Sequence, residues 1–190
     1  MKKREELHRI LQPLGINVYL DSEKGITLTE VEETGETFED NALLKAVSGC
    51  KDSGLPCIAD DSGLCIDALD GAPGVYSARF LGEDTPYPEK MAKVIEMMKD
   101  VPDEKRTARF VSTAAVAFPD GTSFVVRGVC EGKIGYEQKG VNGFGYDPIF
   151  MVGEKSFAEF TAEEKDAVSH RGKSIRLLAE KLGEMIKQDN

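Results

Sequence analysis

The sequence predicts an α/β or α+β domain organised around one main sheet. Stretches with helical spacing of apolar residues interleave with β-rich runs along the 190-residue chain, without an internal repeat or linker. Hydrophobic residues make up 41% of the chain and charged residues 31%, which is an ordinary globular composition. We therefore expect a single domain over residues 1–190, because one core can serve a chain of this length.

Helices are predicted where apolar residues recur every three or four positions. The stretches with this spacing are residues 4–12, 38–52, 88–99 and 169–187. Pro13 and Gly15 end the first helix. Thr37 is a plausible cap for the second helix, which Gly54 and Pro56 stop.

Strands are predicted where apolar residues alternate or β-forming residues dominate. These runs are residues 16–20, 57–59, 64–66, 107–118 and 122–130. Pro119-Asp120-Gly121 separates the last two runs and predicts a hairpin.

The charge balance restricts the partners of the chain. It carries 24 Lys+Arg against 34 Asp+Glu, a formal net charge of -10, which repels nucleic acid overall. A small anion in a local basic pocket, or a divalent cation held by carboxylates, remains compatible with that charge. The sequence has no run of about 18 apolar residues and no secretory signal pattern, so we expect no membrane partner.

The cysteines predict reduced thiols. Cys50, Cys57, Cys65 and Cys130 form no Cys-x-x-Cys motif, and the two histidines do not complete a zinc pattern. Buried thiols without a disulfide framework are typical of a cytoplasmic protein, which is the location we expect.

Two clusters of charged side chains are candidates for phosphate and metal chemistry. Asn41 and Lys45 share one face of a helix, which suits a bound phosphate, although a solvated helix face is the simpler interpretation. Asp60 and Asp61 follow an apolar strand, where ligands bind in open α/β sheets. Adjacent carboxylates repel, so a metal ion or a basic partner would stabilise them. Ser62 adds a hydroxyl, and an acidic turn is the equally weighted alternative.

Two later clusters are candidates for binding a base and for contacting an anion or a carbonyl. In Gly143-Phe144-Gly145-Tyr146-Asp147, glycines around two aromatic rings allow close approach and a flat stacking surface for a base, or a turn packed on its own rings. Thr161 and Glu164 fit a capping box beside Lys165. Ser169 is positioned to cap the last helix, where His170-Arg171 would contact an anion or a carbonyl, unless the histidine is structural. Together the clusters predict a nucleotide whose phosphates take a metal ion.

The chain resembles the inosine/xanthosine triphosphate pyrophosphatase family in five stretches that keep the family's order and span nearly the whole sequence. The stretches are Glu33-Thr34-Gly35-x-Thr37-Phe38-x-x-Asn41-Ala42-x-x-Lys45-Ala46, Ala59-Asp60-Asp61-Ser62-Gly63-Leu64, Gly71-Ala72-Pro73-Gly74-Val75-Tyr76-Ser77-Ala78-Arg79, Gly143-Phe144-Gly145-Tyr146-Asp147-Pro148-Ile149-Phe150, and Glu163-Glu164-Lys165 with Ser169-His170-Arg171. Each motif alone is weak evidence for the family, but five motifs in the family's order are specific for it.

The resemblance implies an elongated, two-lobed α/β fold with a twisted mixed sheet flanked by helices and an active site in the central cleft. It implies a homodimer and an enzyme that uses Mg²⁺ to hydrolyse deaminated purine nucleoside triphosphates (ITP, dITP, XTP) to the monophosphate and pyrophosphate. By motif, Asp61 would be the general base, and Glu33 and Asp61, with Asp60 as a further candidate, would hold the metal. The implied substrate contacts are Lys3, Lys45, Ser62, Phe144, Gly145, Tyr146, Asp147, Lys165, His170 and Arg171.

Within these implied roles, residues 144–147 line the nucleobase pocket, and His170 and Arg171 approach the 6-keto group. A donor such as Arg171 pairs with that carbonyl and is left unpaired by the amino group of adenine. Guanine carries the same carbonyl, so its exclusion must come from elsewhere.

The sequence departs from the family pattern at two places. Asp40 stands where the family usually has Glu. The family's first strand and Ser/Thr-x-Asn loop are absent before Lys3, so we expect that the natural protein starts upstream of Met1. In the family this loop holds the phosphates. Because it is missing here, the second interpretation is a nucleotide-binding module with weak or no turnover. A structural or protein-interaction domain is a third, which the acidic and His-Arg motifs disfavour.

Overall fold

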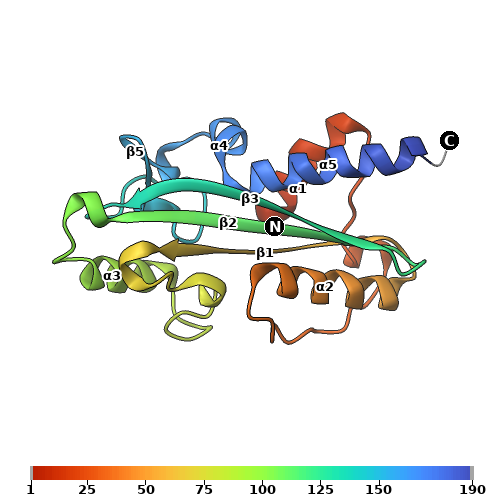
Figure 1. The fold of residues 1–190 in the computed structure, drawn as a ribbon, viewed down its shortest axis with the longest axis horizontal. Helices are drawn as coiled ribbons and strands as arrows, with labels where there is room; N and C mark the ends of the chain where they lie inside the picture. The colour runs from red at the N-terminus through yellow and green to blue at the C-terminus, as the bar shows by residue number, and fades with distance from the viewer. Residues whose placement is uncertain (1, 189–190) are drawn as a thin grey trace.

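Five strands form one sheet in the order β1-β2-β3-β4-β5. The computed structural model describes residues 2–188, without the side chains of residues 2–4, 14 and 186–188. The strands are β1 Cys57–Ile66, β2 Thr107–Ala117, β3 Ser123–Ile134, β4 Phe150–Val152 and β5 Lys155–Ser156. The three long strands run along the length of an elongated molecule (Figure 1). This confirms the α/β class that the sequence predicts.

The strand pairing is antiparallel throughout the described residues, which corrects the mixed sheet implied by the resemblance. The connection from β1 to β2 passes through α3 (Tyr87–Met97), which packs at one end of the sheet (Figure 1). The chain thus re-enters the sheet at the end where it left, and neighbouring strands joined in this way are antiparallel. The predicted hairpin between β2 and β3 is present, with Pro119 and Asp120 at the centre of a turn that the Gly121 N–H closes on the Phe118 carbonyl at 3.0 Å.

Helices cover both faces of the sheet. In Figure 1, α1 (Lys2–Leu11) and α5 (His170–Gln188) lie above the long strands, and α2 (Phe38–Ser53) lies below them. The short α4 (Ala162–Val168) precedes α5. Within residues 2–188, no helix combines the length and apolar character that a bilayer crossing needs.

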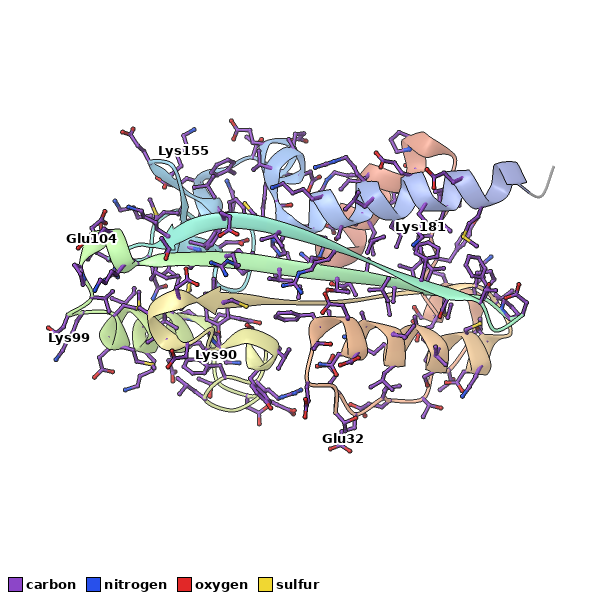
Figure 2. All side chains as sticks on the ribbon, in the orientation of Figure 1. Glu32, Lys90, Lys99, Glu104, Lys155 and Lys181 are labelled. Carbon is purple, nitrogen blue, oxygen red and sulfur yellow. The ribbon has the colours of Figure 1, made fainter. Side chains whose placement is uncertain are left out.

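Alternation along β2 divides the core between these layers. Ala114 and Val116 pack with α1 and α5 on one face, whereas Ala115 and Ala117 pack with α2 on the other. A third cluster, around Phe110, joins the sheet to α3. Figure 2 shows side chains filling these layers.

Two sequence predictions about strands are wrong. Residues 16–20 form no strand, because no described segment pairs with them, and an extended segment needs a ladder partner. Residues 57–66 form one continuous strand instead of two strands around an acidic turn. Asp60 and Asp61 stand opposite Ala114 and Thr113 in regular register, so the ladder with β2 keeps this acidic stretch extended. The four predicted helices are confirmed.

Candidate active site

Strand β1 sends its two adjacent carboxylates to opposite faces of the sheet, because side chains alternate along a strand. Asp61 faces α2, where the Asn41 amide donates to its Oδ2 at 3.2 Å and Lys45 Nζ lies 3.6 Å from its Oδ1. Asp60 and Ser62 face α5, where Arg171 approaches them at 3.4 and 2.8 Å. Each carboxylate therefore has its own cation.

Helix α2 aims its polar side chains at β1 because its start is fixed. Thr37 caps the helix and accepts a hydrogen bond from the Asp40 backbone at 3.1 Å. Asn41 and Lys45, one turn apart, then point to the same carboxylate, as the spacing predicts. The side-chain Oδ1 of Asn41 also accepts the backbone N–H of Gly35 at 2.8 Å, which ties the preceding loop to the helix.

That loop completes a line of alternating charges that we call the charged row: Arg79, Glu33, Lys45 and Asp61. Glu33 Oε1 accepts from Lys45 at 2.6 Å, and its Oε2 accepts from Arg79 at 3.3 Å. The row is partly exposed, with the side chains of Lys45, Glu33 and Arg79 at 25%, 26% and 30%. It therefore presents two cations to solvent without burying them.

The charged row has the oxygen donors that a magnesium ion prefers. Mg²⁺ is usually held by one or two carboxylates together with substrate phosphates. Glu33 and Asp61 supply two carboxylates, linked through the Lys45 ammonium. Within residues 5–185 no three His, Cys, Asp or Glu side chains gather as a metal cluster, so phosphate oxygens would have to supply further ligands. The donor set fits a metal that arrives with a phosphorylated ligand.

On the far side of β1 lies a cavity of about 90 Å³ that we call the aromatic pocket. Eight of the ten predicted substrate-contacting residues line it: Ser62, Phe144, Gly145, Tyr146, Asp147, Lys165, His170 and Arg171. Lys45 belongs to the charged row instead, and the side chain of Lys3 lies outside the described residues, although its backbone is in α1. The sequence clusters thus converge on two adjoining parts of one site.

The glycine-flanked loop shapes one wall of the aromatic pocket. Gly143 and Gly145 have φ of +70° and +66°, which other residues adopt at a cost. This turn lets the Phe144 N–H donate to the Asp147 carboxylate at 2.8 Å. Tyr146 is 3% exposed and donates its hydroxyl to the Ser77 carbonyl at 2.9 Å. The Tyr146 hydroxyl thus binds the protein's own backbone while the residue lines the pocket, and Phe144 is the aromatic ring of this loop that remains partly exposed.

Buried charges surround Phe144. Lys165 Nζ lies 4.8 Å and Arg171 Cζ lies 5.4 Å from its ring centroid, both within the range of cation–π attraction. Lys165 pairs with Asp147 at 2.6 Å and with Glu6 at 3.7 Å, and Arg171 pairs with Glu6 at 2.8 Å. All four side chains are less than 10% exposed, so the network is held in a low-dielectric environment.

The environment shifts the pKa of two of these groups. Burial raises the pKa of the Asp147 carboxyl, and the Lys165 ammonium offsets this only in part. Burial acts to lower the pKa of Arg171, but the carboxylates of Asp60 and Glu6 outweigh it, so the pKa of the guanidinium is raised. Arg171 therefore stays charged inside the pocket.

Helix caps place the two cations and the histidine. The predicted capping box of Thr161 and Glu164 is present at the start of α4 and fixes Lys165 in the next turn. Ser169 accepts the Gly172 N–H at 3.0 Å at the start of α5. The His170 ring stacks on Phe110, with centroids 4.6 Å apart and planes at 14°, so its ring is held rigidly at the pocket wall.

Sequence reasoning missed Glu6 and gave no role to Arg79. Glu6 lies on α1 four residues before Ile10, on the side of the helix that packs into the core, and it is 6% exposed. A carboxylate on the buried face of an amphipathic helix is a signal for a buried cation partner. Arg79 lies in a matched motif, but nothing in its spacing pointed to Glu33, 46 residues away.

A larger cavity elsewhere lacks this chemistry. It measures about 460 Å³ and is lined mainly by apolar side chains from residues 16–28 and 55–58. Its charged lining residues are Asp21 and Lys24, so it gathers no group of catalytic side chains among the described residues. The two-part site around β1 is the stronger candidate.

An aromatic pocket with buried cations, next to an exposed row of lysine, arginine and carboxylates, defines an α/β protein suited to a phosphorylated aromatic ligand. The model of the Ham1 family matches residues 1–181. The chain therefore belongs to the Ham1 family.

Individual relatives agree with this assignment. A dITP/XTP pyrophosphatase of Bacillus cereus is 52% identical over 161 residues, covering 83% of this chain and 78% of that protein. A dITP/XTP pyrophosphatase of Mycobacteroides abscessus is 47% identical over 97% of this chain and 92% of its own length. The solved structure of a HAM1 protein from Coxiella burnetii is 40% identical and superimposes with a TM-score of 0.86 over 96% of this chain and 94% of that one.

Proposed function

We propose that this protein hydrolyses deaminated purine nucleoside triphosphates (dITP, ITP and XTP) to the monophosphate and pyrophosphate. The names of the relatives support this substrate class. The observation that carries the proposal is that two adjacent residues of β1 join the two parts of the site, because Ser62 lines the aromatic pocket and Asp61 belongs to the charged row. A base in the pocket would place its phosphates along that row.

The aromatic pocket would select the base. A purine would stack on Phe144, which is the partly exposed aromatic side chain of the glycine-flanked loop. Arg171 and Lys165 are donors without acceptor capacity, so they favour a 6-keto oxygen. The 6-amino group of adenine would leave a buried donor unpaired, which costs about 1–3 kcal/mol. Selection against adenine follows from this cost.

Asp61 would act as the general base. Its carboxylate is held by Asn41 and faces Lys45, so it is positioned beside the phosphates to accept the proton of the attacking water. The water oxygen bonds to a phosphorus of the α–β bridge as the bond from that phosphorus to the bridging oxygen breaks, and Lys45 stabilises the charge of the pyrophosphate that leaves. This division of roles gives proton transfer to one side chain and charge stabilisation to another.

We further propose that Glu33 and Asp61 hold Mg²⁺ together with the phosphates. The ion, when bound, neutralises phosphate charge and orients the water. Asp60 faces Arg171 on the opposite side of β1, which supports assigning it to the aromatic pocket and not to the metal. Chelation with EDTA should abolish turnover, and added MgCl₂ should restore it.

A product assay tests the proposed function. The protein is incubated with ITP and MgCl₂, and inosine monophosphate, inosine diphosphate, phosphate and pyrophosphate are separated. We expect monophosphate and pyrophosphate in equal amounts. Nucleotide binding without hydrolysis would favour the nucleotide-binding module instead, and release of phosphate with the diphosphate would contradict cleavage at the α–β bridge.

The resemblance also suggests a cytoplasmic homodimer. The four cysteines are free thiols, which suits a reducing compartment. Sedimentation equilibrium tests the dimer, for which we expect twice the 20.8 kDa mass of the chain.

A further inference from the structure

We propose that Arg79 is a phosphate-binding residue of this site. Together with Lys45 it binds the β and γ phosphates, which leave as pyrophosphate. The inference rests on the proposed function for the identity of the substrate. It starts from Glu33, whose two carboxylate oxygens are divided between Lys45 at 2.6 Å and Arg79 at 3.3 Å. Two cations that share one carboxylate are spaced to share two oxygens of one phosphate group.

The hydrogen bonds of Arg79 leave donors for a ligand. Its Nη1 donates to Glu33 Oε2 and its Nη2 to the Glu33 carbonyl, both at 3.3 Å, which is beyond the usual N–H···O range. A guanidinium has five N–H donors, so three have no hydrogen-bond partner among the described residues. The side chain is 30% exposed, so a phosphate can reach it.

Three hydrogen bonds hold the two residues that precede Arg79, Ser77 and Ala78. The Ser77 hydroxyl accepts the Leu64 N–H of β1 at 2.9 Å, and the Tyr146 hydroxyl donates to the Ser77 carbonyl. The Lys90 ammonium, which is 1% exposed, donates to the Ala78 carbonyl. Lys90 lies on α3 (Figure 1) and is labelled in Figure 2. A fixed backbone makes the guanidinium a pre-positioned contact.

Position along the site indicates which phosphates Arg79 would bind. Ser62 and Ala78 line the aromatic pocket. Their sequence neighbours Asp61 and Arg79 belong to the charged row, outside the pocket lining. With the base in the pocket, the α phosphate lies nearest the pocket wall, and the β and γ phosphates extend toward the row.

The test measures inorganic pyrophosphate binding by calorimetry, in EDTA, so that metal and turnover play no part. Glu33→Gln should bind pyrophosphate at least as tightly as wild type, because a carboxylate beside the phosphates is removed. Adding Arg79→Gln in that background should weaken binding about 10-fold or more, as expected for loss of a charge-assisted hydrogen bond. Inosine monophosphate affinity should change less than about twofold.

The Glu33→Gln background distinguishes a direct contact between Arg79 and phosphate from mere neutralisation of the Glu33 carboxylate by Arg79. If Arg79 only offsets the charge of Glu33, Arg79→Gln has no effect once Glu33 is neutral, and the proposal is overturned. It is also overturned if Glu33→Gln binds no pyrophosphate, or if pyrophosphate and monophosphate weaken equally. Arg109→Gln is the matched control, because Arg109 is an exposed arginine of β2 that pairs with Asp67 and Glu131. It should leave both affinities unchanged.

The result is independent of whether the proposed function holds. Failure of ITP hydrolysis with a pyrophosphate effect at Arg79 would reject the reaction and keep the phosphate site. Normal ITP hydrolysis without a pyrophosphate effect would keep the reaction and reject this role of Arg79.

Discussion

The aromatic pocket and the charged row contain the same kinds of ionic group in opposite environments. In the pocket, Lys165 and Arg171 are 6% and 4% exposed and are paired with buried carboxylates. In the row, Lys45 and Arg79 are 25% and 30% exposed around one carboxylate. Buried pairs are costly to break, whereas exposed pairs exchange readily. The pocket can thus keep one shape for a base, while the row can exchange carboxylate for phosphate.

The largest expected effect is on turnover. Asp61→Asn keeps the shape of the side chain but removes the proton acceptor, and kcat for ITP should fall about 10²–10⁴-fold. Steady-state kinetics and a thermal melt measure activity and folding together. Asp67→Asn, on the exposed segment directly after β1, is the control and should retain activity. A folded Asp61→Asn protein with near-normal kcat would remove Asp61 from this role.

The comparison between the two regions predicts a difference in stability. Lys165→Met leaves buried Asp147 and Glu6 without their ammonium, and the free energy of unfolding should drop by about 3–5 kcal/mol. Lys45→Met removes a partly exposed pair and should cost about 1 kcal/mol or less. Urea unfolding measures both. Equal losses of unfolding free energy in the two variants would show that the pocket pairs stabilise the fold no more than the pairs of the charged row.

Phe144 tests the pocket as a base-binding surface. Phe144→Ala removes the stacking ring, which is worth roughly 1–3 kcal/mol of binding free energy. KM for ITP should therefore rise about 5- to 150-fold. Inhibition by pyrophosphate should stay unchanged, because that ligand has no base. Tyr136→Ala, an exposed aromatic outside the pocket, is the control. A weakened pyrophosphate affinity in Phe144→Ala would indicate a general distortion instead of lost stacking.

The stability of the protein should also depend on pH through Asp147. Burial raises the pKa of Asp147 above its unfolded value of 3.8, so its ionised form is disfavoured in the folded protein. Its contribution to stability is present below the unfolded pKa and is lost as pH rises through the folded pKa. The unfolding free energy of wild type minus that of Asp147→Asn should therefore decrease with rising pH in urea titrations. An increase would mean that the pair with Lys165 dominates over burial.

Local pattern predicted most of the fold. The helices, their caps and the β2–β3 hairpin follow from spacing and end signals that act within a few residues. The strand around Asp60 and Asp61 could not be predicted in the same way. Its polar composition favours a turn locally, and only the ladder with β2, about 50 residues later, keeps it extended.

The candidate site was predictable in residue type but not in arrangement. Motifs identified Lys45 and Lys165 as cations, yet only the fold separates them into the charged row and the aromatic pocket. Glu6 joins the pocket through a contact with Arg171, 165 residues along the chain. Contacts of that separation depend on packing of whole helices, which no local signal encodes.

The most direct test of the account is the ratio of kcat/KM for ITP to that for ATP, with magnesium and pyrophosphate release as the readout. The two substrates differ at position 6 of the purine, where the pocket offers donors. We predict a preference for ITP of at least about tenfold, the equivalent of one unpaired buried donor. Equal values for ITP and ATP would contradict the proposed selection of deaminated purines.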